Sequence, residues 1–377
     1  MNVSNETDAP TFVGIDVPEW KCQQPLEPEG APIMQITTIG IDLAKNIFAV
    51  HGVNEHGRTV LKKVLKRNHV AEFFANLPAC VIGMEACASA HYWARKLQTM
   101  GHTVRLIAPQ FVKPYVKTNK NDAADAEAIC EAVARPNMRF VPVKTIEQQS
   151  VLSLHRVRQG FVRARTAQAN QIRGLLAEFG IVVPQGIGHL ERQVPELIED
   201  ADNELTGSFR LLIQRLIDHL KDLDRQVREL EKQIQSWHRS DEASQRLARV
   251  PGIGPLTASA FVASVGDAKS FRNARQLAAW VGLVPRQNSS GGKNVLLGIS
   301  KRGDVYLRTL LIHGARSLLQ VAKRKECKSG WLHGLLQRRN ANVAAVALAN
   351  RNARIVWALL VHDREFDADY HAPAATA

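Results

Sequence analysis

The stretch that decides the fold is Thr38-Ile39-Gly40-Ile41-Asp42-Leu43-Ala44-Lys45-Asn46-Ile47-Phe48-Ala49-Val50. Its pattern predicts a strand, a tight turn and the beginning of a second strand. Side chains alternate along a strand, so Gly40 and Asp42 share the face opposite to Ile39. A carboxylate in such a strand is costly to bury. Asp42 is therefore either a strand-end residue that points into water or a metal ligand, and the choice depends on finding further ligands.

The residues that follow predict a mixed α/β sheet of the ribonuclease H-like kind. Residues 36–66 have the pattern of three strands, and the turn 54–57 joins the second strand to the third. Further elements are expected at 69–77 (helix), 79–84 (strand), 89–100 (helix), 102–108 (strand) and 122–134 (helix), with a loop opening at Pro109. Strands one and four are often neighbours in such sheets, so acids at their ends would meet at one edge.

Four acids fit this edge. Asp42 and Glu85 end the first and fourth strands, and Asp122 and Asp125 share one face at the beginning of a helix. Asp122 alone is also explained as a helix N-cap. Four converging carboxylates repel one another unless cations lie between them, and oxygen ligands suit Mg²⁺ or Mn²⁺. We therefore predict a divalent-metal site that acts on a phosphodiester.

The middle of the chain predicts long helices. Residues 147–180 are helical and carry several arginines, and residues 184–195 form a break between two prolines. From Phe209 to Trp237 the apolar positions alternate in steps of four and three, which is typical of a coiled-coil seam. The seam predicts either a hairpin with 147–180 or a dimer contact, and the pattern does not decide between them.

The C-terminal part predicts a compact helical domain with two motifs. Residues 250–258 (Val-Pro-Gly-Ile-Gly-Pro-Leu-Thr-Ala) resemble a helix-hairpin-helix, whose backbone N–H groups at Gly252 and Gly254 would hold a phosphate. A plain helix–helix turn explains the same residues. In the second motif, Ser289-Ser290-Gly291-Gly292 forms a loop with cations on both sides. A serine there either attacks phosphorus or belongs to an ordinary flexible linker.

The composition favours a polyanionic partner. The net charge is +13 and the isoelectric point is near 9.7, which indicates nucleic acid rather than a membrane. No run of about 18 apolar residues and no signal peptide is present. The five cysteines are scattered and form no CxxC pair, so a zinc site is not indicated and a reducing cytoplasm fits.

Together and in this order, the motifs between residues 35 and 370 resemble those of an insertion-sequence transposase family. Members of this family carry a four-acid, RuvC-like N-terminal domain and a separate serine-bearing C-terminal domain, and the Piv-type DNA invertases are relatives. The motifs that carry the resemblance are the Gly-Ile-Asp strand, the strand-end Glu, Lys-x-Asp-x-x-Asp-Ala, Pro-Gly-Ile-Gly-Pro and the Ser-Gly loop.

The resemblance implies a function and a set of site residues. The family's acids fall on Asp42, Glu85, Asp122 and Asp125, and its catalytic serine falls on Ser290, with Ser289 as the neighbouring candidate. It implies a transient phosphoserine link to DNA, one composite site, several subunits, a structured guide RNA and a bacterial, nucleoid-associated location. The residues expected to contact nucleic acid are Gly252, Gly254, Arg286, Lys293, Lys301, Arg302, Arg308, Arg156 and Arg163.

The expected organisation has five parts. These are a disordered extension (1–34), a RuvC-like metal-dependent domain (35–145), basic helices with a coiled coil (146–240), a transposase domain (241–365) and a disordered tail (366–377). Two rival functions remain open. In one, the four acids form a Holliday-junction-type nuclease and the serine loop only binds phosphate; in the other, the protein binds nucleic acid without catalysis.

Overall fold

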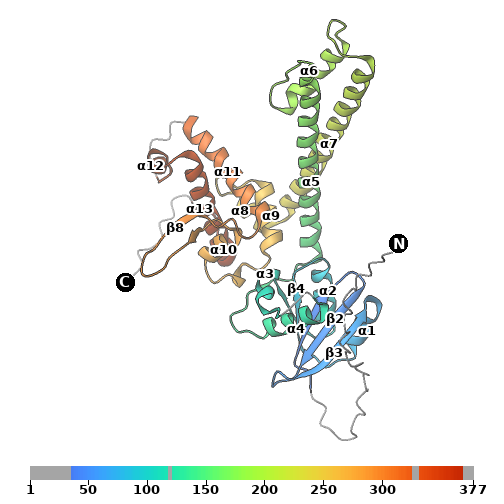
Figure 1. Cartoon of the computed structure of the whole chain (residues 1–377). Helices are drawn as coiled ribbons and strands as arrows, with labels where there is room; N and C mark the ends of the chain where they lie inside the picture. The colour runs from blue at the N-terminus through green and yellow to red at the C-terminus, as the bar shows by residue number, and fades with distance from the viewer. Residues whose placement is uncertain (1–34, 118–120, 325–330, 368–377) are drawn as a thin grey trace, which may run out of the picture.

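The computed structural model describes residues 35–117, 121–324 and 331–367. Within this range, a six-stranded sheet, a pair of long helices and a mainly helical C-terminal part follow one another along the chain (Figure 1). The predicted disorder of residues 1–34 and of the tail from residue 368 falls outside the described residues and stays a prediction.

The N-terminal sheet is mixed and has the strand order β3-β2-β1-β4-β5-β6. Its central pairs β1/β4 and β4/β5 are parallel, and the other pairs are antiparallel. The strands are β1 (Thr38–Leu43), β2 (Ile47–Val53), β3 (Thr59–Lys66), β4 (Val81–Glu85), β5 (Thr103–Ile107) and β6 (Phe140–Val141). The predicted mixed sheet is therefore confirmed, and strands one and four are neighbours.

Helices cover both faces of this sheet. They are η1 (Arg67–His69), α1 (Val70–Ala75), α2 (Ala90–Gln98), α3 (Pro109–Val112), η2 (Lys113–Tyr115) and α4 (Asp122–Val133). Ile39 and Ile41 are buried in the same apolar cluster as Phe74 of α1 and Trp93 of α2. Helix α4 packs on the opposite face. The expected loop at Pro109 is wrong, because Pro109 begins the short helix α3, where its fixed φ and missing N–H are tolerated.

Glycines let α4 approach the sheet closely. A Cβ atom at Gly40 would lie 2.2 Å from the carbonyl oxygen of Ala126, and one at Gly83 would lie 2.8 Å from the Cβ of Val133. Both distances are too short for real side chains, so this packing requires glycine on β1 and on β4. The helix is therefore held against two neighbouring strands at a fixed distance.

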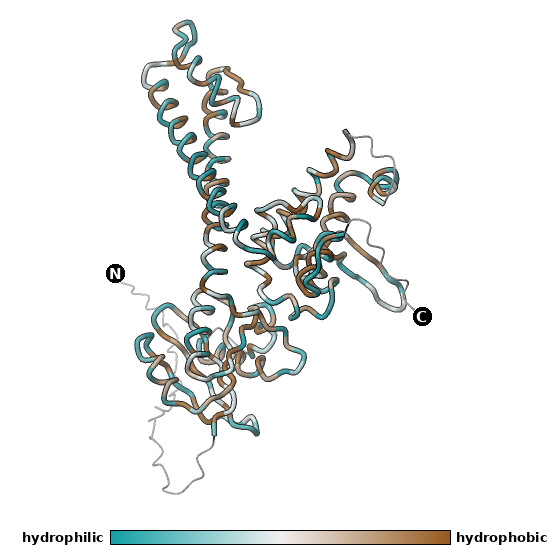
Figure 2. The backbone as a smooth tube through the Cα atoms, turned by 180° about the vertical axis from the view of Figure 1, so that it is seen from behind, coloured by the Kyte–Doolittle hydropathy of each residue, from teal (hydrophilic) through white to brown (hydrophobic). Residues whose placement is uncertain are grey.

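Two long antiparallel helices, α5 (Ile146–Ala177) and α7 (Gly207–Ser240), project from the sheet and pack along each other (Figure 1). Ile213, Leu220 and Val227 belong to the predicted seam and are buried residues of α7. Figure 2 shows hydrophilic and hydrophobic residues alternating along both helices, as expected for helices that bury one side. The contact lies within one chain, whereas supercoiling of the pair stays a prediction.

The predicted break at residues 184–195 is wrong in part. Helix α6 (Ile187–Glu199) lies there and contains Pro195. Leu190 and Val194 are buried with residues of α5 and α7, so packing of this apolar face outweighs the hydrogen bond that proline removes.

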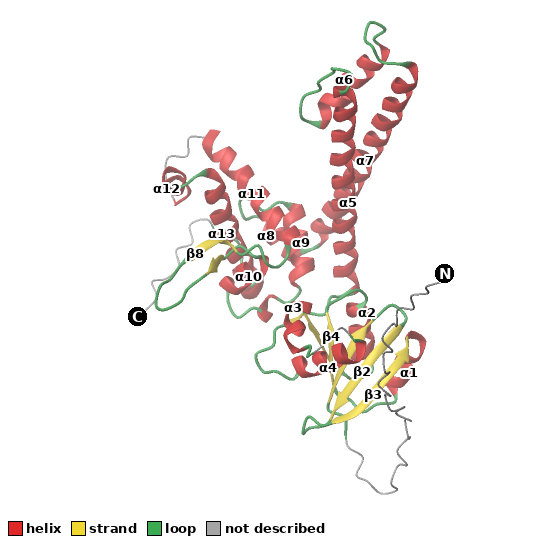
Figure 3. Cartoon of the chain, in the orientation of Figure 1, coloured by secondary structure: helices red, strands yellow, loops and turns green. Residues whose placement is uncertain are grey.

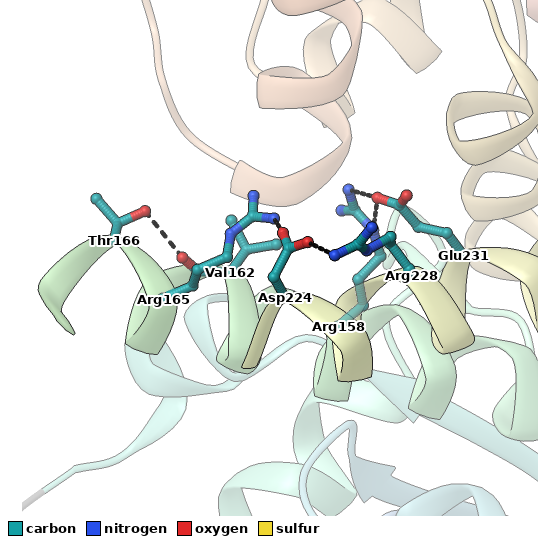
Figure 4. Close-up of polar contacts among 7 residues, drawn as sticks. All are labelled: Arg158, Val162, Arg165, Thr166, Asp224, Arg228 and Glu231. Carbon is teal, nitrogen blue, oxygen red and sulfur yellow. Dashed lines mark hydrogen bonds and ion pairs between the residues drawn. The ribbon is translucent and has the colours of Figure 1, made fainter. Parts of the chain in front are cut away.

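Charged pairs fix the register of α5 against α7 (Figure 4). Arg158 binds Glu231, with 2.9 Å between Arg158 Nε and Glu231 Oε1, and Arg165 binds Asp224. Asp224 also binds Arg228 of its own helix. Asp224 keeps only 16% of its side chain exposed, so the loss of one partner would leave a poorly solvated charge.

The C-terminal part is mainly helical with one small hairpin (Figure 3). Its helices are α8 (Glu242–Ala248), α9 (Pro255–Val265), η3 (Ala268–Ser270), α10 (Ala274–Val281), α11 (Val305–Arg324), α12 (Trp331–Arg338) and α13 (Ala341–His362). Strands β7 (Pro285–Gln287) and β8 (Leu296–Ile299) pair as an antiparallel hairpin. The serine loop is therefore the end of a β-hairpin and not a flexible linker, because the strands on either side of it pair.

Helix α13 is the one described helix that is long and apolar enough to cross a membrane by length and composition. Its residues Ala345, Ala349 and Val356 are fully buried in the C-terminal core beside Phe261 of α9. Buried core helices can have the same length and apolar composition, so α13 is weak evidence for a membrane-spanning helix.

Candidate active site

Four acidic side chains meet at the edge of the sheet where β1 and β4 end. The two strands are parallel and pair Gly40 with Gly83, so Asp42 and Glu85, two residues further along, lie on the same face as these glycines. That is the face covered by α4. The close approach of α4 at Gly40 brings the first turn of this helix, with Asp122 and Asp125, over the strand ends.

Asp42, Asp122 and Asp125 lie close enough to share one cation. One carboxylate oxygen from each lies within 4.8 Å of the others. Glu85 is outside this group of three, but its carboxylate feels the charges of Asp42 and Asp125. All four predicted acids are therefore brought to one place.

The charges of the site act on one another. Burial raises the pKa of Glu85, and the negative charges of Asp42 and Asp125 raise this pKa further. Burial and the charges of Glu85 and Asp42 also raise the pKa of the neighbouring Cys87 thiol. Cys87 belongs to the surroundings of the site, and no spacing in the sequence indicated it.

Asp122 is not the N-cap of its helix. Asn121 has this position, and its side-chain oxygen accepts a hydrogen bond from the Ala123 N–H at 3.0 Å. The alternative explanation of Asp122 as a cap is therefore wrong, and its carboxylate is available to the acid site. The helix dipole adds a favourable field for carboxylates in this first turn.

The donor set fits a divalent cation. It consists of carboxylates without imidazole or thiolate in the cluster of three, which is the ligand chemistry of Mg²⁺ and Mn²⁺. The pKa of Glu85 is raised first by burial and then by repulsion from Asp42 and Asp125, and a cation would relieve this repulsion. Asp42, Asp122, Asp125 and Glu85 are therefore the residues that would hold the metal.

Ser290 lies at the turn of the β7–β8 hairpin. Gly291 and Gly292 both have positive φ (55° and 80°), as a two-residue type I′ turn requires, and the Lys293 N–H donates to the Ser290 carbonyl at 3.0 Å. Ser290 is exposed. The Ser289 hydroxyl accepts a hydrogen bond from the Val295 N–H at 3.3 Å, whereas no hydrogen bond to the Ser290 hydroxyl is found among the described residues.

The serine and the acids do not meet within one chain. Figure 1 shows the β7–β8 hairpin and the six-stranded sheet apart, with the hairpin beside the C-terminal helices and the sheet at the base of α5. The acids are thus assembled by the fold of one chain, whereas Ser290 is presented elsewhere on it.

The predicted nucleic-acid contacts differ in exposure. The exposed ones are Arg156, Arg163, Arg286, Lys293, Lys301, Arg302 and Gly254. Arg308 is only 8% exposed, and its guanidinium donates to the Val281 carbonyl at the end of α10, 2.8 Å away. Arg308 therefore holds the fold together, and its predicted contact with nucleic acid remains untested.

The residues around Gly252 form a tight turn between α8 and α9. Gly252 has a φ of 86°, and a Cβ atom there would lie 3.2 Å from the Gly314 carbonyl of α11. Asn352 of α13 donates to the Pro251 carbonyl at 2.9 Å. One side of the turn is therefore packed on two helices, and its role as a helix-hairpin-helix stays a prediction.

Two family matches cover the two halves of the chain. Residues 39–181 match the DEDD transposase family of IS110 elements, and residues 244–329 match the family described as transposase IS116/IS110/IS902. The first match contains all four acids and the second contains Ser290.

Relatives match over nearly their whole length. A probable family 20 transposase from Pseudomonas aeruginosa is 56% identical over 87% of this chain and 97% of its own. The transposase of insertion sequence IS1328 from Yersinia enterocolitica is 46% identical over 88% and 98% of the two chains. The protein belongs to the IS116/IS110/IS902 transposase family. A third relative, the transposase of IS1111A from Coxiella burnetii, is 45% identical over 88% of this transposase and 91% of its own chain.

Family membership makes this transposase an enzyme that cleaves and rejoins DNA. Its substrate is a polyanion, in agreement with the predicted partner and with the net charge of +13. The two family matches divide the candidate residues in the same way as the structure does, with the acids in one part and the serine in the other.

Proposed function

We propose that this transposase cuts and rejoins the ends of its insertion sequence through a phosphoserine intermediate at Ser290, with a divalent metal at the four acids. The observation that supports it most directly is the convergence of Asp42, Asp122 and Asp125 within 4.8 Å. When bound, Mg²⁺ or Mn²⁺ would supply Lewis-acid stabilisation of charge on the reacting phosphate.

The proposed reaction conserves the number of phosphoester bonds. The Ser290 hydroxyl loses its proton, its oxygen forms a bond to phosphorus, and one deoxyribose oxygen leaves and takes up a proton. A second DNA hydroxyl then displaces the serine and regenerates it. Arg286 lies on β7 and Lys293 bridges Ser290 across the turn, and these two cations would hold the phosphate oxygens.

The hairpin favours Ser290 over Ser289 as the nucleophile. The Ser289 hydroxyl is bound to the backbone of the opposite strand, whereas the Ser290 hydroxyl is exposed at the turn. The turn conformation fixed by the two glycines would orient this hydroxyl without the entropy cost of an unstructured loop.

We propose further that the acids of one subunit complete the site around Ser290 of another. Two observations support this: the hairpin and the sheet are apart within one chain, and β8 exposes Leu296 and Leu297 to solvent beside the turn. Exposed apolar side chains of this kind are typical of a surface that a partner covers. A structured guide RNA is part of the proposal on the strength of the family resemblance.

The test is covalent trapping on element-end DNA. Labelled DNA, RNA transcribed from the same element and Mg²⁺ are incubated with the wild type, Ser290→Ala or Ser289→Ala, and the products are separated under denaturing conditions. We expect a protease-sensitive adduct with the wild type and Ser289→Ala, and none with Ser290→Ala. Loss of the adduct only in Ser289→Ala would move the nucleophile by one residue.

The second candidate is a metal-dependent nuclease of the Holliday-junction type, which uses the acids alone. The separation of Ser290 from the acids within one chain favours it, because the acid site is complete without the hairpin. Free 3′-hydroxyl ends that form with Mg²⁺, survive Ser290→Ala and disappear in Asp42→Asn would support the nuclease over the recombinase.

A further inference from the structure

A cavity of about 700 Å³ lies on the N-terminal domain, next to the β1–β2 turn. Its lining combines cations, amides and aromatic rings with two aliphatic side chains. The residues are Asn46, Ile47, Lys66, Arg67, Asn68, Ala71, Tyr92, Trp93 and Lys96. No carboxylate lines it. The cavity is separate from the acid cluster and is not part of the function proposed above.

Two of the three cations of this cavity lie over aromatic rings. The Arg67 guanidinium lies 5.4 Å from the ring centre of Trp93, and the Lys96 ammonium lies 6.0 Å from that of Tyr92. Among the described residues, no carboxylate lies within salt-bridge distance of Lys66, Arg67 or Lys96. Their positive charge is therefore not neutralised by a carboxylate and remains available to an anionic ligand.

These groups match the parts of one nucleotide. A base has a flat π face that would stack on Tyr92, which is 46% exposed, and the amides of Asn46 and Asn68 would pair with base edges. The three cations suit phosphate. The bases of a duplex are stacked inside it, so only an unpaired base enters such a cavity.

The cavity shares one lining residue with a second cavity beside the acid site. A second cavity of about 440 Å³ is lined by Ile47, Ala49, Val64, Asn121, Asp122 and Ala123. Ile47, which is 49% exposed, lines both cavities, and Asp122 belongs to the acid cluster. Helix α2 lines the first cavity and α4 lines the second, and these helices cover opposite faces of the sheet, so the two cavities are treated as separate.

We infer that the cavity around Tyr92, Lys66, Arg67 and Lys96 binds an unpaired nucleotide. The binding of this nucleotide does not rest on the function proposed above. Single-stranded DNA and single-stranded RNA carry the same chemistry, and the experiment separates them.

The experiment measures binding by the full-length chain without metal, in the Asp42→Asn background, so that no strand is cut. The probes are fluorescent single-stranded DNA and RNA of one sequence and the corresponding DNA duplex. We expect Tyr92→Ala to weaken single-strand binding about tenfold, as the loss of one stacked base does, and Tyr92→Phe to stay close to the parent. Duplex binding should not change.

A charge-matched pair tests the cations. Lys66→Ala/Lys96→Ala should weaken single-strand binding and lower its dependence on salt concentration. Lys63→Ala/Lys113→Ala removes the same charge from exposed positions outside the cavity and should change single-strand binding much less. Equal losses in the two pairs, or equal binding by Tyr92→Ala and Tyr92→Phe, would overturn the inference.

Two comparisons complete the design. The first compares the two single-stranded probes. If Tyr92→Ala weakens RNA binding more than DNA binding, the cavity binds RNA, and the reverse result indicates DNA. The second compares Ser290→Ala with its parent, which should bind the single strands equally. The nucleotide-binding result is then independent of whether Ser290 is the nucleophile. The unfolding temperature of Tyr92→Ala is measured to check that this variant is folded, because the Tyr92 ring packs edge-to-face against Trp93.

Discussion

Glu85 lies among charges of its own sign, and this has a measurable cost. Its pKa is raised by burial, by Asp42 and by Asp125. A carboxyl whose pKa is higher in the folded state loses stabilisation as the pH rises above its ordinary value of 4.5, and the full penalty is present above the raised pKa. The metal-free site is therefore destabilised by the same arrangement that would hold a cation.

We predict that Glu85→Gln raises the unfolding temperature of the metal-free protein at neutral pH, because the neutral amide removes this repulsion. The same substitution should lower DNA cleavage about a hundredfold or more by weakening a metal site.

Differential scanning calorimetry with and without Mn²⁺ measures the change in unfolding temperature. Asp222→Asn, on an exposed part of α7, is the control and should leave cleavage unchanged. A lower unfolding temperature for Glu85→Gln would show that the charge is already compensated.

At the scale of elements, three helices meet at His155. This residue of α5 is 1% exposed, and its ring nitrogens lie 2.9 Å from the Tyr306 hydroxyl of α11 and 3.1 Å from the Ser259 hydroxyl of α9. Ser259 donates its own proton to the Pro255 carbonyl at 2.7 Å, so it accepts from the His155 Nε2–H. Nδ1 is then the acceptor for Tyr306, and the network is satisfied with a neutral ring.

We predict that the stability of the protein falls as the pH drops from about 6.5 to about 4. Burial, followed by the charge of Arg158, lowers the pKa of His155 to about 4, so below 6.5 the unfolded chain binds a proton that the folded chain does not. The loss from this residue is about 3 kcal/mol across the window. Urea unfolding at several pH values measures it.

His155→Gln should reduce this pH dependence. His91 has a similar pKa of about 4 through burial, Lys144 and Arg95, so His91→Gln is needed as the matched comparison. A wild type that is equally stable across the window would contradict the neutral network. Tyr306→Phe should lower stability at neutral pH, because it removes the donor to a buried ring nitrogen.

Elements with a clear pattern were predictable, and those decided by tertiary contacts were not. The alternation around Ile39 and Ile41 identified β1, and its neighbour β4 followed from the order of elements. By contrast, Pro195 lies inside α6 because packing of Val194 supports that helix, and proline alone indicated a break. The seam of α7 indicated a helical partner, but only the structure identifies it as α5.

The candidate site shows the same division. Residue types and order were enough to select the four acids, which the structure brings together, whereas Ser290 was selected through the family resemblance and its role stays a prediction. The sequence did not show that Asn121 caps α4 and frees Asp122, or that Gly291 and Gly292 form a type I′ turn. It also did not separate Arg308, which is buried, from the exposed cations near it, because that difference depends on the position of α10.

At the scale of the whole molecule, the acids and the serine occupy different parts of the chain. We predict that two inactive variants restore each other's activity if the site forms between subunits. Asp42→Asn and Ser290→Ala should each form no adduct alone. Their mixture should reach about a quarter of the wild-type yield, the statistical value for a freely exchanging dimer with two sites.

The control for this mixture is Ser290→Ala together with the double variant Asp42→Asn/Ser290→Ala, which contains no intact serine. It should stay inactive at every ratio. A mixture of the single variants that also stays inactive, although the subunits exchange, would place the complete site within one chain and require the β7–β8 hairpin to move to the sheet.

The separation of the hairpin from the sheet also has a consequence for the host genome (Figure 1). If two subunits must meet before DNA is cut, the cutting rate rises with at least the square of the amount of protein at low expression. A cell that makes only a few copies of the transposase would then have almost no DNA breaks, and a modest increase in gene dose would raise the frequency of transposition steeply. The architecture itself would thus limit how often the element jumps.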